Sequence, residues 1–427
     1  MSVLSASSRV VVVGAGIIGL ACAWAVQRHG LAVTLVDRDF DGDRASHGNA
    51  GAIAIGECLP LSLRELGLKP LRWLVDPLGP LAIRPGDAIG LLPWFRALRR
   101  ASTVEAEHGA ATALAAINGQ ALPAFAGMLT DIGLEHALHR GGALTVYESE
   151  AAFEAEQAQW ALKRTLGVDW QLVDAQSLRT LEPALSPLLT HGVLEADGAF
   201  VDDPREVVTA LGQHVRTGGA TCVTGNAVAL AFDRGADPAV LLDDGRRIAG
   251  ERLVLAAGAW SGRLARTVGD RVLLASERGY NTTLPASTGR LKHAITFAER
   301  RFVATPLAPG LRIGGAAEFA GVAAPANFRR SDALLKLAHR YLPGLDDRGA
   351  VRWMGQRPAT PDSLPVIGPS PRDRRLLHAF GHGHLGLTQS AATGELIADF
   401  VTGSRPQIDP RPYSIGRFVT RPSPPTP

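Results

Sequence analysis

Residues 9 to 37 read RVVVVGAGIIGLACAWAVQRHGLAVTLVD, and this stretch decides the fold. The β-branched run Val10 to Val13 predicts a buried strand that breaks at Gly14. An alanine-rich segment with apolar residues at helical spacing follows and runs to Arg28. A second strand is expected over Ala32 to Asp37. Strand, glycine turn, helix and strand make a βαβ unit, so free N–H groups at the start of the helix lie beside the glycines.

The glycine spacing of this unit suits a dinucleotide. Gly14 permits a tight turn, Gly16 lets the backbone approach a pyrophosphate, and Gly19 lets the helix pack on the strand. Asp37 is expected to accept hydrogen bonds from both ribose hydroxyls, and its charge disfavours a 2′-phosphate. The alternative is a tight turn without a ligand. The predicted contacts are Gly14, Gly16, Ile17, Ile18, Gly19, Asp37 and Arg38.

Three further stretches bear on the choice between FAD and NAD. They are RASHGNAG at 44–51, ERLVLAAGAWS at 251–261 and GHGHLGLT at 381–388. Each alone is equally well a strand end or a tight loop, but together their small residues favour main chain running along a pyrophosphate and onto a flavin ring, as FAD requires. The contacts expected from the first two stretches are Ser46, Asn49, Ala50, Gly51, Ala257, Gly258 and Trp260.

In order and spacing, these motifs, together with PLAIRP (80–85) and RPATPDSLPVIG (357–368), resemble the FAD-dependent D-amino-acid dehydrogenases. That family lies within the wider group of D-amino-acid, glycine and sarcosine oxidases, and the resemblance spans essentially the whole chain. It implies an α/β fold with a Rossmann-like FAD-binding domain and a substrate domain built on a largely antiparallel sheet. Polar-apolar alternation in 277–286 and 301–319 supports such a sheet independently.

The resemblance also implies discontinuous domains. The expected segments are 1–60, 191–270 and 351–420 for the FAD-binding domain, 61–190 and 271–350 for the substrate domain, and 421–427 for a frayed tail.

Oxidation of an amine beside a carboxylate needs a fixed cation to hold the carboxylate. Arg357 is the candidate because its guanidinium can bind a carboxylate bidentately, and an arginine in this motif does so in the resembling family. The alternative is a structural arginine paired with Asp362 or a surface carboxylate. Tyr280 is the second candidate for the carboxylate or the active-site wall, the alternative being ordinary sheet packing, and Arg278 is a weaker one.

The stretch GHGHLGLT precedes an apolar helix expected to begin around Leu387 or Thr388. A helix N-terminus carries unpaired N–H groups and a partial positive charge, which suits the pyrimidine oxygen of a reduced flavin. His384 is a candidate base or a determinant of substrate choice, and His382 a structural histidine. Without Cys or acidic residues spaced to complete a set, the two histidines predict no metal site. The expected contacts are Gly383, His384, Leu385, Gly386, Leu387 and Thr388.

Composition bounds the setting. The chain is 46% apolar and 20% charged with a formal charge of +3, which describes an ordinary globular enzyme and gives no argument for nucleic acid. Three scattered cysteines and the lack of a leader or spanning segment predict a cytoplasmic protein. Since no cysteine follows Cys222, where related sarcosine oxidases carry their flavin link, FAD should be noncovalent.

Residues 68–85 and 89–100 combine aromatic side chains, leucines and arginines. They predict either peripheral contact with an anionic membrane or a buried helical hairpin with solvated arginines. The resemblance implies a quinone or another electron carrier as acceptor, although the sequence does not separate dehydrogenase from oxidase.

The expected activity is FAD-dependent oxidation of a D-amino acid, in amino-acid catabolism, to an imino acid that water converts to keto acid and ammonia. A cyclic substrate such as D-proline or D-hydroxyproline is one expectation. Glycine or sarcosine oxidation, oxidation of a 2-hydroxy acid, and nucleotide binding without turnover are the alternatives.

Overall fold

The βαβ unit is present in the computed structural model, which describes residues 9–66, 81–233 and 235–418. Strand β1 (Arg9–Val13) pairs in parallel with β2 (Ala32–Asp37), and helix α1 (Ile17–Arg28) joins them. Gly14 has φ +107°, and a Cβ there would lie 2.4 Å from the carbonyl oxygen of Ala256. The turn therefore needs glycine both for its dihedral angle and for the close approach of a neighbouring strand.

This unit belongs to a six-stranded sheet in the order β10-β2-β1-β14-β21-β20. All of its pairs are parallel except that between β20 and β21. Its strands therefore come from the beginning, the middle and the end of the chain. The remaining members are β10 (Thr221–Thr224), β14 (Arg252–Leu255), β20 (Val366–Pro369) and β21 (Leu376–Phe380).

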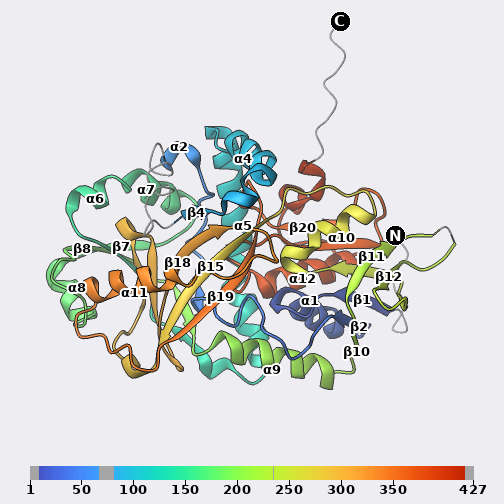
Figure 1. Ribbon diagram of the computed structural model, residues 1–427, viewed down its shortest axis with the longest axis horizontal. Helices are drawn as coiled ribbons and strands as arrows, with labels where there is room; N and C mark the ends of the chain where they lie inside the picture. The colour runs from blue at the N-terminus through green and yellow to red at the C-terminus, as the bar shows by residue number, and fades with distance from the viewer. Residues whose placement is uncertain (1–8, 67–80, 234, 419–427) are drawn as a thin grey trace, which may run out of the picture.

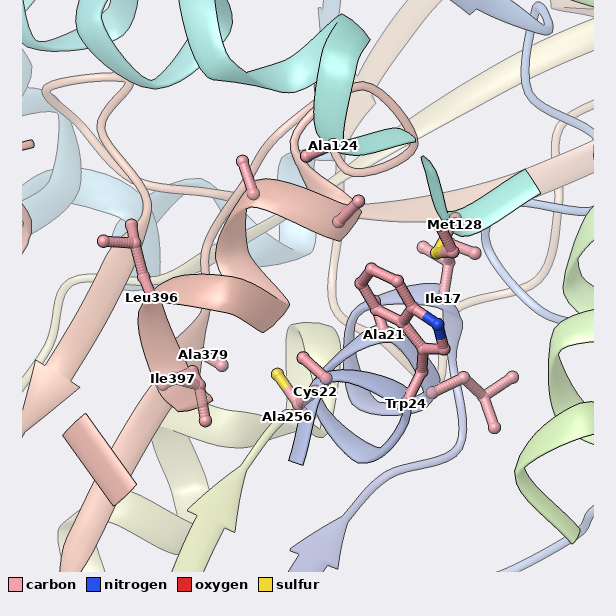
Figure 2. Close-up of a cluster of buried hydrophobic side chains, with 14 of the residues drawn as sticks. Ile17, Ala21, Cys22, Trp24, Ala124, Met128, Ala256, Ala379, Leu396 and Ile397 are labelled. Carbon is pink, nitrogen blue, oxygen red and sulfur yellow. The ribbon is translucent and has the colours of Figure 1, made fainter. Parts of the chain in front are cut away.

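Helices α1, α5 (Val104–Asp131) and α12 (Ser390–Thr402) share one core with this sheet. Trp24 of α1 is 1% exposed, and its indole N–H donates to the Asp131 carboxylate at 2.9 Å. Figure 2 shows side chains of the three helices gathered with Ala256 and Ala379, which lie at β14 and β21. Cys22 lies in this cluster with no exposed surface, as a small core residue.

A nine-stranded, mainly antiparallel sheet lies beside the first (Figure 1). Its path is β19-β15-β18-β17-β16-β6-β8-β7, with β4 paired to β18. Helix α11 (Arg329–Tyr341) packs against β15 and β18. The strands are β4 (Leu81–Ile83), β6 (Ala143–Tyr147), β7 (Trp170–Asp174), β8 (His191–Glu195), β15 (Ala275–Leu284), β16 (Ala294–Phe297), β17 (Phe302–Leu307), β18 (Gly310–Phe319) and β19 (Val351–Ala359).

Two small sheets and shorter helices complete the described chain. The small sheets are β3 (Ala52–Ile53), β9 (Ala199–Val201) and β5 (Leu138–Arg140), and β11 (Ala227–Ala231), β12 (Ala239–Leu242) and β13 (Arg247–Ala249). The helices are α2 (Leu63–Leu66), α4 (Ala88–Ala101), α6 (Glu150–Glu154), α7 (Gln157–Thr165), α8 (Ala175–Leu181), α9 (Pro204–Thr217) and α10 (Ser261–Thr267). The expected α/β fold with a parallel and a largely antiparallel sheet is confirmed.

Hydrogen bonding moves two of the expected segment boundaries. Strand β8 follows the boundary at 190 and β19 the boundary at 350, yet both pair within the nine-stranded sheet. Helix α5, expected in the substrate domain, packs with α1 and α12 instead. The sequence motifs mark where the chain meets a cofactor, whereas strand pairing decides which sheet each segment joins.

Helix α4 packs one face onto the molecule. Trp94 and Leu98 are buried, and the Trp94 indole N–H donates to the Ala359 carbonyl at 3.0 Å. On its other side Ile89 is 81% exposed. Residues 67–80, most of the first segment considered for membrane contact, lie outside the described residues. None of the described helices combines the length and the apolar character that crossing a bilayer requires.

Candidate active site

A cavity of about 1380 Å³ lies between the two sheets and is lined by segments from both. It exceeds the roughly 300–1,000 Å³ that suits a drug-sized ligand, so it can hold a dinucleotide together with a small substrate. All the predicted cofactor contacts from the four motifs except Gly19 line this one cavity.

The cradle at the start of α1 fits a pyrophosphate. Gly16 precedes the helix, and nothing lies within 4 Å of the position that a Cβ would take there. A Cβ at Gly19 would lie 1.8 Å from the Gly14 carbonyl oxygen, so the helix start packs tightly on the turn. The space at Gly16 is open, whereas Gly19 packs against the turn, so the first backbone N–H groups of α1 face the cavity.

Asp37 lies where the ribose contact is expected, although part of its carboxylate already has partners. One oxygen accepts a hydrogen bond from the Ala15 N–H at 2.6 Å. The other accepts from the Asp39 N–H at 3.0 Å and lies 3.6 Å from the Arg44 guanidinium. The ribose contact therefore stays a prediction.

Arg38 and Trp260 meet at the cavity wall. The guanidinium carbon of Arg38 lies 4.2 Å from the centre of the Trp260 ring, a cation–π contact. Both residues are predicted cofactor contacts from distant motifs, and both line the cavity, as do Ala257 and Gly258.

The loop of Ser46 to Gly51 is held in place by hydrogen bonds from side chains of the nine-stranded sheet. The Asn281 side-chain amide donates to the Gly48 carbonyl, and the Arg312 guanidinium donates to the Asn49 carbonyl at 2.7 Å. Burial lowers the pKa of Arg312 to about 10. Within the loop, the Asn49 side chain accepts from the Gly51 N–H at 2.7 Å. Asn281 and Arg312 were not predicted, because their strand motif gives no sign of a distant loop.

His47 is buried, and it does not appear among the residues that line the cavity. Its Nδ1 accepts a hydrogen bond from the Arg44 N–H at 3.2 Å, and burial is the main cause that lowers its pKa. These contacts favour a structural role for His47.

Strands β15 and β19 build the floor of the cavity from cross-strand pairs. Glu277 opposes Arg357, Gly279 opposes Gly355, and Asn281 opposes Trp353. A Cβ at Gly279 would lie 2.5 Å from the Arg357 guanidinium, and one at Gly355 would lie 1.8 Å from the Trp353 ring. The Arg357 guanidinium therefore lies over Gly279, and the Trp353 ring lies over Gly355.

Arg357 lines the cavity and forms an ion pair with Glu277, with a distance of 2.9 Å between Nη1 and Oε1. The partner considered from the sequence, Asp362, instead pairs with Arg417 at 2.7 Å. Arg357 is 29% exposed and Glu277 is 18% exposed, so a ligand in the cavity can reach both. The motif contained the arginine but not its carboxylate partner, which lies on another strand.

Tyr280 is 1% exposed, and its ring packs with Phe328 at 6.2 Å between centroids. Its hydroxyl donates to the Glu318 carboxylate at 2.5 Å and accepts from the Asn327 N–H at 3.0 Å. Successive side chains of a strand point to opposite faces, so Tyr280 lies on the face of β15 opposite Glu277 and Asn281. Tyr280 is among the residues that line the cavity, as the predicted active-site wall requires, but its occupied hydroxyl favours sheet packing over the predicted carboxylate contact.

Arg278 shares that far face of β15, and its side chain has no exposed surface. Its guanidinium donates to the carbonyls of Gly321, Ala324 and Pro325. It is a structural arginine.

The loop that contains the two histidines enters α12 later than predicted. The helix begins at Ser390 rather than near Leu387 or Thr388. The Thr388 hydroxyl instead accepts from the Ala54 N–H at 3.1 Å, and the Gln389 amide donates to Asn118 at 2.9 Å. These side chains tie the segment to distant parts of the chain before the helix starts.

Several N–H groups in this loop remain available to a ligand. The Leu385 N–H donates to the His382 carbonyl at 2.9 Å. Within the described residues, the backbone N–H groups of Gly386, Leu387 and Thr388 donate no hydrogen bond. Buried N–H groups are rarely left without an acceptor, so three such groups at a cavity indicate a bound polar atom, as the flavin pyrimidine edge would provide.

The two histidines differ in environment. His382 is 3% exposed, its Nε2 lies 2.9 Å from the Thr393 hydroxyl, and burial lowers its pKa to about 3. It is therefore neutral and structural. His384 is exposed and lines the cavity. Over the part of the chain that the structure covers, no group of three or more His, Cys, Asp and Glu side chains could hold a metal ion.

A parallel sheet with a dinucleotide cradle, joined through one cavity to a second sheet with a polar floor, defines a two-domain dinucleotide-dependent oxidoreductase. The chain belongs to the family described as FAD dependent oxidoreductase (DAO), whose model matches residues 9–400.

Three individual proteins illustrate the likeness. A D-amino-acid oxidase of Bradyrhizobium diazoefficiens is 33% identical over 417 residues, which cover 96% of this chain and 99% of the relative. A D-amino acid dehydrogenase of Rhizobium johnstonii is 28% identical, covering 96% and 100%. The crystal structure of glycine oxidase from Geobacillus kaustophilus superposes with a TM-score of 0.75 at 22% identity, covering 97% and 100%, and this shows a shared fold.

Proposed function

We propose that this protein oxidises a D-amino acid with noncovalently bound FAD, giving an imino acid that water converts to keto acid and ammonia. The observation that carries the proposal is the shared cavity: the dinucleotide cradle, the free N–H groups of 386–388 and Arg357 all line it. The names of the two curated relatives support a D-amino acid as substrate.

The noncovalent state is supported by the position of the cysteines. Cys22 and Cys58 are buried and Cys222 is exposed, and none of the three lines the cavity. The cradle at Gly14 to Gly19 would hold the pyrophosphate, and the N–H groups of 386–388 would hold the pyrimidine edge. When bound, FAD supplies the acceptor for the hydride equivalent that leaves the α-carbon.

Arg357 would hold the substrate carboxylate. In this role it exchanges Glu277 for the carboxylate of the substrate, or binds both, since its guanidinium has more N–H groups than one carboxylate can use. Glu277 then lies beside the substrate and can accept a hydrogen bond from the substrate ammonium. The two side chains would fix one end of the substrate, and the glycine pair Gly279 and Gly355 leaves room for the Arg357 and Trp353 side chains to lie across the floor.

His384 is the proposed contact for the substrate side chain, because it lines the cavity and is exposed. A cyclic substrate such as D-proline or D-hydroxyproline is a narrower form of this proposal. None of the three relatives described above is named for such a substrate, so it is one member of the panel to be tested. A quinone or another carrier is the proposed electron acceptor, with α4 as the proposed contact if the cytoplasmic protein meets a membrane surface.

The test is anaerobic reduction of the bound flavin by a panel of D- and L-amino acids, with glycine, sarcosine, 2-hydroxy acids and both D-hydroxyproline epimers. Bleaching by D-amino acids and not by their enantiomers is the expected result. Bleaching only by glycine, sarcosine or a 2-hydroxy acid would replace the proposal by the corresponding alternative. A protein that takes up FAD but is reduced by none of these compounds would contradict it.

A further inference from the structure

Glu57 is a carboxylate with no hydrogen-bond or ion-pair partner among the residues that the structure describes. It follows β3, lines the cavity, and is accessible from it. Its backbone is fixed, because the Glu57 N–H donates to the Ala54 carbonyl and its own carbonyl accepts from the buried Asn118 side chain at 3.1 Å. Within the described residues its carboxylate makes no hydrogen bond or ion pair, so its acceptor capacity is directed at the cavity.

The surroundings of Glu57 keep it ionised. Lys163 is the first cause that lowers its pKa, burial opposes this, and His384 and Arg301 lower it further. Lys163 is 7% exposed, and its ammonium lies 3.8 Å from the Glu195 carboxylate and 4.3 Å from the centre of the Trp160 ring. A charged acceptor held in place at a cavity wall is expected to meet a donor from the ligand.

The neighbouring charges narrow the kind of donor. Burial opposes the charge of Lys163, but Glu57 and Glu195 outweigh burial and raise the pKa of this ammonium. Lys163 therefore stays cationic beside the carboxylates of Glu57 and Glu195, while Arg301 pairs with Glu156 at 3.9 Å. An anion would be repelled by Glu57, and a cation would meet repulsion from Lys163 as well as attraction from Glu57. A neutral group with an N–H or O–H bond can donate to Glu57 without either repulsion.

On the basis of the proposed function, we infer that Glu57 determines specificity by accepting a hydrogen bond from a neutral donor, a hydroxyl or an amide, on the substrate side chain. His384, from the other end of the chain, lines the same cavity. Arg357 and Glu277 bind the carboxylate and the ammonium of the substrate, and Glu57 accepts the hydrogen bond from its side chain.

Matched substrate pairs test this inference without any variant. In each of D-threonine with D-valine, D-asparagine with D-leucine, and 4-hydroxy-D-proline with D-proline, one member offers a donor where the other offers a C–H group or a methyl group. For the pair with the highest turnover, kcat/KM should favour the donor by roughly 10- to 100-fold, the range for a hydrogen bond to a charged group. D-Aspartate should be a poorer substrate than D-asparagine, because Glu57 repels its side-chain carboxylate.

The variant Glu57→Gln keeps the size and removes the charge, so it should reduce this ratio by at least fivefold while FAD content and activity on the apolar member change little. Glu156→Gln is the matched control, because Glu156 lines the same cavity but already pairs with Tyr147 at 2.9 Å and Arg301 at 3.9 Å. In Glu156→Gln the ratio of kcat/KM between the two members of the pair should equal that of the wild type.

The outcomes separate this inference from the proposed function. Oxidation of D-amino acids with ratios within threefold in every pair, or an unchanged ratio in Glu57→Gln, overturns the inference and leaves the proposed function intact. If no amino acid reduces the flavin, both fail. Should Glu57→Gln lose FAD, the wild-type ratios alone decide.

Discussion

Replacement of Arg357 by alanine separates a substrate clamp from a structural ion pair. The substrate carboxylate would lose two charge-assisted hydrogen bonds, which contribute about 1.5–3 kcal/mol each, or about 3–6 kcal/mol together. Since about 1.4 kcal/mol corresponds to a factor of ten, kcat/KM should fall by roughly 10²- to 10⁴-fold. FAD content should be unchanged, because the pyrophosphate cradle is built from β1 and α1, whereas Arg357 belongs to β19.

Glu277 supplies the second half of this prediction. In Arg357→Ala its carboxylate, which is only 18% exposed, is left without its cation and repels the incoming carboxylate. The double variant Arg357→Ala/Glu277→Gln removes this repulsion, which is worth on the order of 1 kcal/mol, and should regain about fivefold to tenfold in kcat/KM.

Steady-state kinetics of the four proteins in this double-mutant cycle, with flavin reduction under anaerobic conditions, measure both effects. A purely structural pair would lower the melting temperature in both single variants and leave kcat/KM within threefold in whatever protein remains folded. That result, or a double variant no better than Arg357→Ala, would refute the assignment of Arg357 as the carboxylate clamp.

Two further predictions concern the cofactor cradle and the neutral histidine. Gly14 has φ +107°, and the Cβ of Gly14→Ala would lie 2.4 Å from the Ala256 carbonyl oxygen, so this variant should lose at least about 2 kcal/mol of stability and have a lower FAD content. The control Gly90→Ala, whose Cβ would have nothing within 4 Å, should show neither effect. Thermal unfolding measures the stability, and the flavin-to-protein absorbance ratio measures the FAD content. A wild-type level of flavin in Gly14→Ala would contradict the described turn. The folded-state pKa of His382 is about 3 against an ordinary 6.5, so the unfolded chain takes up a proton that the folded chain refuses, and stability is lost as the pH falls from 6.5 towards 3. At pH 5 this loss amounts to about 2 kcal/mol. Urea unfolding should therefore show that the wild type loses about 2 kcal/mol more stability than His382→Gln between pH 7 and pH 5. If the free energies of unfolding of the two proteins change equally with pH, His382 is not held neutral.

The parts of the fold that depend on local sequence could be predicted. The bounds of β1, α1 and β2 follow from a β-branched run, glycines and helical spacing, and the structure reproduces them. The start of α12 could not be predicted, because it depends on Thr388 and Gln389 bonding to residues far away in the sequence. Long-range pairing also moved β8 and β19 into the nine-stranded sheet.

The candidate site shows the same division. Motifs predicted Arg357 and the cofactor loops, because an arginine and clusters of small residues can be recognised directly in the sequence. The partner of the arginine was not visible, because Glu277 is opposed to Arg357 only through the register of β15 and β19. Tyr280 was predicted from the same alternating strand, but the alternation does not show that its hydroxyl is bonded to Glu318 and Asn327. A single acidic residue in a loop carries no motif, so Glu57 was not among the predicted candidates.

The passage of the chain back and forth between the two sheets has a consequence for unfolding. The parallel sheet takes strands from both ends and the middle of the polypeptide, and the larger sheet takes the stretches between them. No single peptide-bond cleavage can therefore release either half with all its strands, and neither half can melt while its connecting segments remain fully ordered. We expect one cooperative unfolding transition, and limited proteolysis that yields nicked but associated fragments rather than a stable excised lobe.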